Sequence, residues 1–177
     1  MEAGRETNVG RLTHVDSTGR ARMVDVGSKR PTRRRARAEG EVRFGAAAFR
    51  ALRENRLAKG DALAVARVAG IQAAKRTDEW IPLCHAIPLD HLAVEIELLE
   101  ESRTARVTAE ARARWTTGVE MEALVAVSAS CLALYDMAKA LDRGIVIGDV
   151  RLVEKQGGRS GRWVRGRSAP RRRRAAD

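Results

Sequence analysis

The chain is poor in aromatic residues and cysteine, and each shortage excludes a class of protein. Aromatic residues make up 3% of the 177 residues, so the core must be filled by Ala, Val and Leu. The only two cysteines, Cys84 and Cys131, lack the CxxC spacing of a zinc or redox motif, and we expect both to be reduced. No apolar run reaches the ~20 residues that a membrane helix needs. The first eleven residues, MEAGRETNVGR, lack the apolar segment of a secretory signal, which predicts a cytoplasmic protein.

Positive charge is abundant, but it is concentrated in two short segments. The net charge of the whole chain is +11. Residues 29–39 contain six basic residues and one acid, and residues 165–177 do the same, so each segment contributes +5. The other 153 residues therefore sum to +1. We expect one basic loop or strand start and one basic tail, rather than a folded domain with a basic surface.

The longest apolar segment, residues 118–144, predicts a helix that is buried on most of its sides. Gly118 and Gly144 supply start and stop signals, and no charged residue lies between Glu122 and Asp136. At ~1.5 Å per residue these two acids lie roughly 21 Å apart, nearly on one face of the helix. One small active site cannot easily use both ends of a single helix. The chain therefore has either two sites, or one site to which two copies each contribute one end, and we adopt the second hypothesis.

Strands and helices follow one another along the rest of the chain in a pattern typical of an α+β fold. Alternation of apolar and polar residues predicts the strands, and Asp61 is a natural N-cap for the helix behind it. The expected strands are 33–44, 92–98, 105–115 and 150–155, with a short candidate at 21–26. The expected helices are 46–55, a helix that follows Asp61 and ends at about residue 77, and the long helix already described. This order is the split βαβ pattern of a ferredoxin-like fold, an antiparallel sheet with helices packed on one face.

Two motifs near the middle of the chain carry candidate site residues. Lys59-Gly60-Asp61 places a lysine before a helix N-terminus, which suits anion binding, although an ordinary N-cap beside a solvated lysine is the simpler explanation. His85 follows Cys84 in an apolar loop that contains two prolines. Because no spacing resembles a zinc pattern, we expect no metal, and hydrogen bonding or proton transfer suits this histidine better. A purely structural histidine is the alternative.

The two ends of the long helix carry its charged residues. Glu120 and Glu122 lie near its start, where the helix dipole favours carboxylates and where a carboxylate can accept N–H bonds from a guanine-type edge. Asp136 and Lys139 are three residues apart near its end and can pair on one face. Partial burial would shift the pKa values of both and suit acid–base catalysis, whereas a solvated surface pair is the alternative.

Eight motifs, taken in order, resemble those of one enzyme family. They are LTHVD, MVDV, KGD, ARVAGIQAAKRT, IPLCH, TGVEMEAL, YDMAKA and GGRSG. Together they resemble the cyclic pyranopterin monophosphate synthases, which act in the second step of molybdenum cofactor biosynthesis. The resemblance covers about residues 12–161. We therefore place a single α+β catalytic domain at residues 11–161, between a flexible tail at 1–10 and an Arg-rich disordered tail at 162–177.

The resemblance implies a lyase whose substrate derives from GTP. The substrate of the family is the 3′,8-cyclised dihydro-GTP. Its purine five-membered ring is opened, a pyranopterin is built, and a sugar hydroxyl attacks the α-phosphate to give a cyclic phosphate and pyrophosphate. The resemblance also implies a homohexamer, a trimer of dimers with sites at the dimer interfaces, and no required cofactor.

By motif, the resemblance assigns catalysis to Lys59, Asp136 and Lys139. Asp136 and Lys139 would transfer protons during ring opening and closure, and Lys59 would assist phosphate or proton transfer. The residues that would form the substrate pocket are Leu83, Cys84, His85, Glu120, Met121 and Glu122. The residues that would bind the triphosphate are Lys29, Arg34, Lys155 and Arg159. Extra arginines in GSKRPTRRRARAEG leave open which arginine of residues 30–37 contacts phosphate.

Two functions of other classes stay open at this point. The chain fits a basic ferredoxin-like RNA-binding module, although the shortage of aromatic residues on its strands argues against base stacking on the sheet. It also fits a non-catalytic homologue that acts as a scaffold. A salt-sensitive complex with RNA would favour the first, and a hexamer without turnover would favour the second.

Overall fold

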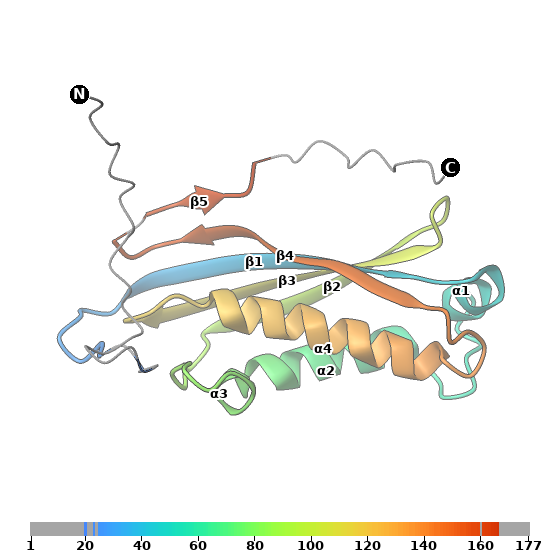
Figure 1. Ribbon diagram of the computed structural model, residues 1–177, viewed down its shortest axis with the longest axis horizontal. Coiled ribbons are helices and arrows are strands. Elements are labelled where there is room, and N and C mark those ends of the chain that lie inside the picture. The colour runs from blue at the N-terminus through green and yellow to red at the C-terminus, as the bar shows by residue number, and fades with distance from the viewer. Residues whose placement is uncertain (1–19, 21–22, 24, 160, 167–177) are drawn as a thin grey trace, which may run out of the picture.

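The sheet is five-stranded and antiparallel, with helices covering one of its faces (Figure 1). The computed structural model describes residues 20, 23, 25–159 and 161–166. The strands are β1 (Thr32–Arg43), β2 (His91–Leu99), β3 (Thr104–Trp115), β4 (Val146–Gln156) and β5 (Trp163–Val164). The helices are α1 (Ala46–Arg53), α2 (Ala62–Ala74), α3 (Thr77–Trp80) and α4 (Glu120–Ala138).

The strand order β2-β3-β1-β4-β5 places β3 between β1 and β2. Strands β1 and β3 pair along their whole length, from Thr32 opposite Trp115 to Arg43 opposite Thr104. The α+β prediction, with an antiparallel sheet and helices on one face, is confirmed. The narrower ferredoxin-like assignment stays a prediction, which this strand order supports.

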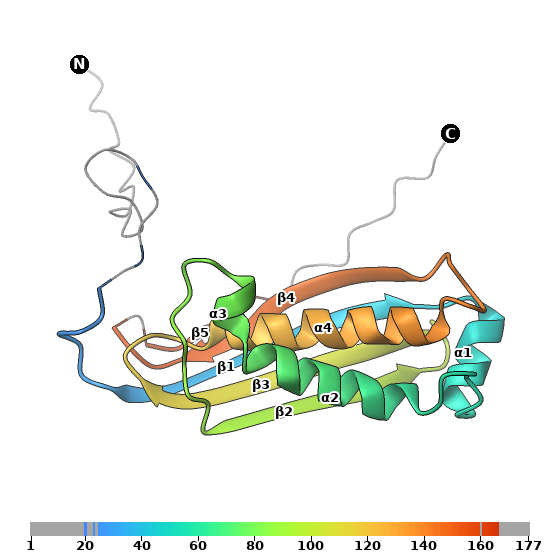
Figure 2. The same ribbon diagram turned by 90° about the horizontal axis from the view of Figure 1, so that it is seen from below.

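Small inward residues let α4 lie close to the sheet. Ala36, Ala38 and Val42 are fully buried on β1, as the alternation predicts. A Cβ added to Gly40 would lie 2.7 Å from Cγ1 of Val127, so this position admits only glycine unless α4 moves. Helix α4 packs over β1, β3 and β4, and α2 packs beside it against β2 (Figure 2). By length and composition alone α4 could cross a membrane, but its burial between the sheet and α2 makes it a core helix.

The two long helices also approach one another closely, at Gly70 of α2. A Cβ there would collide with Oγ of Ser130 and would lie 2.8 Å from the carbonyl oxygen of Ala126. Ser130 is fully buried and donates a 2.9 Å hydrogen bond to the carbonyl oxygen of Ala66. This contact fixes the separation of α2 and α4, and with it the position of the residues at both ends of α4.

We expect Gly70→Ala to destabilise the protein by about 1–3 kcal/mol. The free-energy cost of overpacking the α2–α4 contact should exceed the free energy gained from the higher helix propensity of alanine. Gln72→Ala, an exposed change on the same helix, should stay within about 0.5 kcal/mol of the original protein. Urea unfolding of the three proteins measures both effects. Equal midpoints for Gly70→Ala and the original chain would show that the helices separate at no cost.

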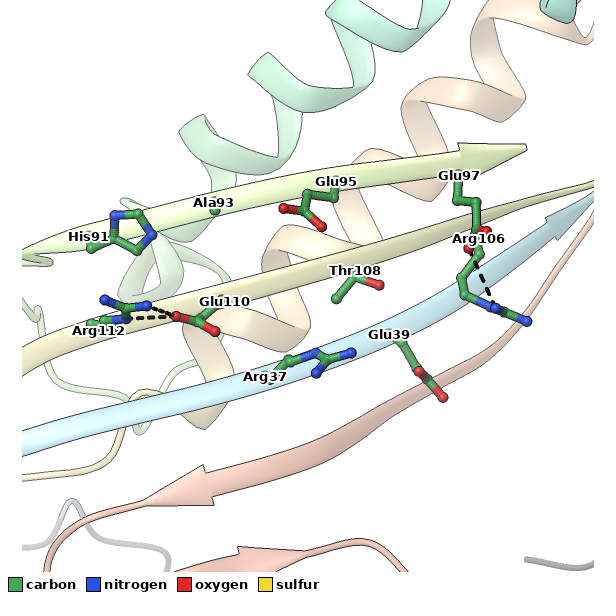
Figure 3. A pocket seen from close by; sticks show the side chains of 10 residues that line it. All are labelled: Arg37, Glu39, His91, Ala93, Glu95, Glu97, Arg106, Thr108, Glu110 and Arg112. Carbon is green, nitrogen blue, oxygen red and sulfur yellow. Dashed lines mark hydrogen bonds and ion pairs between the residues drawn. The ribbon is translucent and has the colours of Figure 1, made fainter. Parts of the chain in front are cut away.

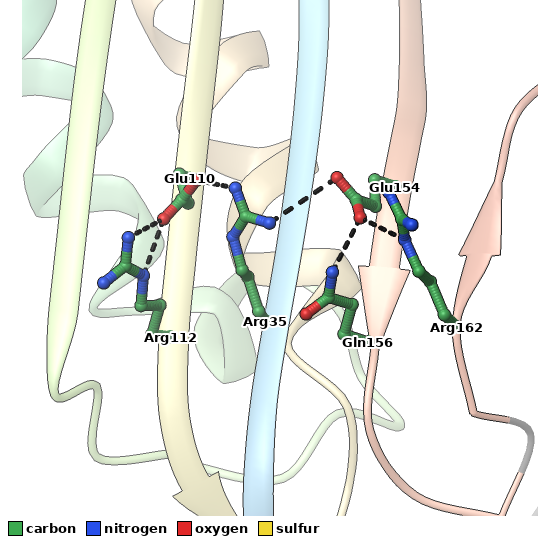
Figure 4. Close-up of polar contacts among 6 residues, drawn as sticks. All are labelled: Arg35, Glu110, Arg112, Glu154, Gln156 and Arg162. Carbon is green, nitrogen blue, oxygen red and sulfur yellow. Dashed lines mark hydrogen bonds and ion pairs between the residues drawn. The ribbon is translucent and has the colours of Figure 1, made fainter.

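The face of the sheet away from the helices is charged. A row of paired side chains crosses three strands there, from Arg112 and Glu110 on β3 through Arg35 on β1 to Glu154 on β4 (Figure 4). The row ends on Arg162, whose Nε donates to Glu154 at 2.8 Å and so ties the start of β5 to β4. The Arg35 hydrogen bond lowers the pKa of Glu110, whose carboxylate is thereby kept ionised.

Most predicted elements are present with small shifts of their ends, and four features differ. Strand β4 begins at Val146, four residues before the predicted strand, and passes through an irregularity near Asp149, which has a φ of 54°. Helix α3 and strand β5 were not predicted; β5 lies within the segment that we expected to be tail. In the strand candidate at 21–26, residues 23, 25 and 26 lie outside any strand, and the others fall outside the described residues.

Candidate active site

A pocket of about 320 Å³ lies at the N-terminal end of α4. The loop after α3 provides one wall, and the β3–α4 connection and the first turn of α4 provide the other. Seven of the predicted site residues line it: Lys29, Leu83, Cys84, His85, Glu120, Met121 and Glu122. Val26, Ile87, Thr117 and Gly118 complete the lining. The structure therefore brings together residues from three separate segments of the chain.

Glu122 is the most unusual acid of this pocket. Only 3% of its surface is exposed, and its Oε2 atom has no hydrogen-bond partner within the described residues. Burial raises the pKa of this carboxyl to about 7, and repulsion from Glu120 and Asp78 adds to the effect. Near neutral pH Glu122 therefore exists in both protonation states, and it can donate or accept a hydrogen bond.

The raised pKa of Glu122 makes stability depend on pH. In the unfolded chain the group titrates near its ordinary pKa of 4.5. The contribution of Glu122 to stability is therefore greatest below pH 4.5, where Glu122 is protonated in both the folded and the unfolded state, and it falls as the pH rises through about 7. We expect Glu122→Gln to become more stable relative to the original protein by about 2 kcal/mol between pH 5.5 and pH 8.5. Urea unfolding at the two pH values measures the difference.

Glu110→Gln is the matched control for that experiment. Its lowered pKa places its titration below 4.5, so the stability lost by this change should be the same at pH 5.5 and at pH 8.5. A Glu122→Gln difference that is equally flat with pH would show that Glu122 is ionised without penalty in the folded protein.

Cys84 is a thiol in this pocket rather than a thiolate. Burial raises its pKa, and the negative charges of Glu122 and Asp78 raise it further. Cys131 lies on α4 and is fully buried, and burial raises its pKa to about 12. Both cysteines are free, as the sequence predicted. Cys84 is therefore a neutral wall of the pocket and a poor nucleophile.

A second cavity, of about 580 Å³, adjoins the first. Lys29 borders both. The other charged residues of the second cavity are Arg30, Arg34 and Arg159, so it presents four cations and no acid. Lys155, the remaining residue predicted to bind the triphosphate, lies on β4 opposite Ala36 and lines neither cavity. The arrangement suits a polyphosphate beside a half-apolar pocket.

The predicted catalytic residues form a separate cluster at the other end of α4. Nζ of Lys59 lies 2.5 Å from one carboxylate oxygen of Asp136, and Nζ of Lys139 lies 2.7 Å from the other. Asp61 caps α2 by accepting a 2.9 Å bond from the amide of Ala64, as predicted, which holds the loop that carries Lys59. The hydrogen bonds from Lys139 and then Lys59 lower the pKa of Asp136 to about 2, and the bond to Asp136 raises the pKa of Lys139.

The sequence left two alternatives for Asp136 and Lys139, a partly buried pair or a solvated one. In the single chain 52% and 50% of their side chains are exposed. Their pKa values accordingly move apart rather than toward neutrality, because each stabilises the charge of the other. In the single chain these residues are a solvated ion pair.

The pocket and the Lys59–Asp136–Lys139 cluster cannot meet within one chain. Glu122 and Asp136 are fourteen residues apart on a continuous helix, which separates them by roughly 21 Å. The N-terminal end of α4 lies beside α3, whereas its C-terminal end lies toward α1 (Figure 2). The first end holds the pocket and the cations, and the second end holds Lys59, Asp136 and Lys139.

The hollow on the charged face of the sheet is a weaker candidate, although it measures about 560 Å³ (Figure 3). Its charges are largely paired with one another, as in Arg106 with Glu97 and Arg112 with Glu110. It contains none of the predicted site residues. Among the described residues, no three His, Cys, Asp or Glu side chains are grouped to hold a metal ion.

Sequence reasoning missed two contributions to the site. Asp78 on α3 lies close enough to Glu122 and Cys84 for its charge to raise the pKa values of both, and nothing in its local sequence marks it. Thr117 and Gly118 line the pocket, whereas the sequence pattern indicated Gly118 only as a helix start signal.

Comparison with known proteins covers nearly the whole described chain. Residues 23–158 match the model of the MoaC family. The chain is 55% identical over 155 residues to the cyclic pyranopterin monophosphate synthase of Brucella ovis, an alignment that covers 88% of this chain and 94% of the relative. The enzyme of Brucella abortus is similar to the same extent, and that of Brucella canis is 54% identical over the same lengths. The matched segment contains every residue of the pocket and of the Lys59–Asp136–Lys139 cluster.

Proposed function

The chain belongs to the MoaC family, and from this premise we propose that it is an enzyme that forms cyclic pyranopterin monophosphate in molybdenum cofactor biosynthesis. Its substrate is 3′,8-cyclised dihydro-GTP, and pyrophosphate is the second product. The observation that carries the proposal is the half-apolar pocket with a buried, ionisable Glu122 next to a cavity lined by four cations. A guanine-derived ring and a triphosphate need these two environments side by side.

In this proposal the pocket binds the purine-derived part of the substrate. Glu120 and Glu122 face it from the first turn of α4, and carboxyl groups accept the N–H groups of a guanine-type edge. Glu122, with a pKa of about 7, can also donate to a ring nitrogen. His85 and Cys84 close the opposite wall. These contacts orient the ring beside the cationic cavity.

The cationic cavity binds the triphosphate and promotes the lyase step. The oxygen of a sugar hydroxyl forms a bond to the α-phosphorus, the bond from that phosphorus to the bridging oxygen breaks, and pyrophosphate leaves with the electron pair. Lys29, Arg34 and Arg159 stabilise the negative charge that develops on the leaving group. The hydroxyl proton passes to Asp136, the carboxylate that contacts both Lys59 and Lys139.

The active site is composite, with the pocket of one copy facing the catalytic cluster of another. This arrangement explains why the cluster, though half exposed in one chain, belongs to the same reaction as a pocket about 21 Å away. Contact with a second copy would bury Asp136 and Lys139, which shifts the pKa of the acid up and that of the amine down, toward the range useful for proton transfer. We infer a homohexamer, a trimer of dimers, in the cytoplasm, acting without membrane, nucleic acid or cofactor.

The test is turnover of enzymatically generated 3′,8-cyclised dihydro-GTP, with pyrophosphate and the oxidised fluorescent pterin measured in the same samples. We expect the two to appear together in equal amounts and to be absent without the protein. Binding of the substrate without pyrophosphate would contradict the enzyme assignment and favour a scaffold.

A further inference from the structure

Among the residues that the structure describes, main-chain carbonyl groups and not an acid hold Arg34 in place. It lies near the start of β1, and its side chain points to the helix-covered side of the sheet. Its Nε donates to the carbonyl oxygen of Trp115 at 3.1 Å, and its Nη2 donates to that of Thr116 at 3.0 Å. These two carbonyl groups belong to the end of β3 and to the connection that leads into α4. Two of the five N–H groups of the guanidinium are therefore used inside the protein.

Gly158 covers the other side of the same guanidinium. A Cβ at Gly158 would collide with Nη1 of Arg34 and would lie 2.9 Å from its Cζ. Gly158 has a φ of 72° and Gly157 a φ of 99°, so both adopt the left-handed conformation that glycine tolerates best. A Cβ at Gly157 would in turn collide with the carbonyl oxygen of Arg33. The two glycines thus bring the loop after β4 directly onto Arg34.

These contacts place Arg34 between the two cavities of the site. The carbonyl groups that it binds directly precede Thr117 and Gly118, which line the pocket at the start of α4. The glycine that covers it directly precedes Arg159, which lines the cationic cavity together with Arg34 itself. The wall of one cavity and the cationic loop of the other therefore share a single anchor.

We propose that Arg34 is a positioning residue that clamps the β3–α4 connection against the loop after β4, so that the ring pocket and the triphosphate cavity keep one fixed relative arrangement. This role goes beyond supplying a positive charge to phosphate, and it rests on the proposed function only where turnover is concerned. The planar fork of arginine is required, because a lysine ammonium cannot reach two carbonyl groups from one rigid plane.

The first test is Arg34→Lys, which keeps the charge but removes the fork. We expect kcat to fall roughly 100-fold with a smaller change in KM, because the two parts of the substrate are no longer held in register. Arg114→Lys is the matched control, since Arg114 is an exposed arginine on the neighbouring strand outside both cavities, and it should behave as the original protein. An Arg34→Lys enzyme with unchanged kcat would show that charge alone is sufficient and would overturn the proposal.

The second test displaces the clamp without altering Arg34. Gly158→Ala should push the guanidinium aside and lower kcat to a similar extent. Gly161→Ala is its control, because Gly161 also has a positive φ, of 60°, but a Cβ there meets no atom within 4 Å. The kcat of the double variant Arg34→Lys with Gly158→Ala should lie within about twofold of the kcat of the less active single variant, since both changes remove the same clamp. Fully multiplicative losses would overturn the proposal.

Hydrogen exchange of the unliganded protein separates the clamp from the proposed reaction. The amides of residues 116–118 should exchange faster in Arg34→Lys and Gly158→Ala, but at the original rate in Arg114→Lys and Gly161→Ala. Unchanged exchange in the first pair would overturn the clamp even if turnover were confirmed. Faster exchange in a protein that shows no turnover would instead leave the clamp supported and the proposed function refuted.

Discussion

Replacing Lys59 or Lys139 by alanine should reduce kcat at least ~1000-fold while leaving the fold intact. The two lysines hold opposite oxygens of Asp136, at 2.5 Å and 2.7 Å, so each removal takes away both a positive charge and a proton donor. Their side chains are about half exposed in the chain, so their loss leaves no cavity in the core. Steady-state turnover, with circular dichroism as the check of folding, measures the effect.

Lys75→Ala controls for the loss of a lysine as such. Lys75 is an exposed residue at the C-cap of α2, outside both cavities and the catalytic cluster, so this variant should keep full activity. Lys59→Arg adds a second comparison, because it keeps the positive charge. Its guanidinium differs in shape from an ammonium group and gives up a proton much less readily, so this variant should remain severely impaired. Activity within tenfold of the original in either alanine variant would exclude that lysine from the catalytic machinery.

Two inactive variants, one defective at each end of α4, should regain activity when their chains are mixed. His85→Ala damages the pocket at the N-terminal end, and Lys139→Ala damages the cluster at the C-terminal end. If each active site takes its pocket from one copy and its cluster from another, random assembly gives both intact parts to about a quarter of the sites. We therefore expect about a quarter of the original activity per site from an equal mixture, where each variant alone gives almost none.

The mixture is best made by co-expression with two different affinity tags and purification over both, which selects assemblies that contain both chains. A mixture of Lys59→Ala with Lys139→Ala is the matched control, because both changes affect the same cluster and random assembly cannot restore it. The mixture of His85→Ala with Lys139→Ala could instead show no more activity than the mean of the two separate variants. That result would place the whole reaction within one chain.

Local pattern was sufficient to predict most of the fold. Alternation along β1 placed Ala36, Ala38 and Val42 inside, and Asp61 caps α2 by its side chain. Strand β5 was missed because two residues carry no periodicity, and their order comes from pairing with β4 and from the Arg162–Glu154 contact. The early start of β4 was missed because Asp149 interrupts the alternation with a positive φ.

The site was predicted less evenly. Motif order identified residues that line the pocket. Helix length, at ~1.5 Å per residue, led to the hypothesis that two copies each contribute one end of α4 to a site, and this hypothesis stays a prediction. The raised pKa of Glu122 was not foreseen, because it arises from burial and from Asp78, which lies forty-four positions away in the chain. The Arg34 clamp was not foreseen either, as it joins residues more than eighty positions apart. Long-range contacts of this kind leave no local signal.

The most direct test of the composite site is a crystal structure of the assembled protein with substrate or product bound. We predict that the purine-derived ring will contact Glu122 and His85 of one copy, that the phosphates will lie by Lys29, Arg34 and Arg159, and that Lys59, Asp136 and Lys139 of a second copy will reach the same ligand. A ligand enclosed by one copy alone, with the Lys59–Asp136–Lys139 cluster open to solvent or against an unrelated surface, would contradict this account.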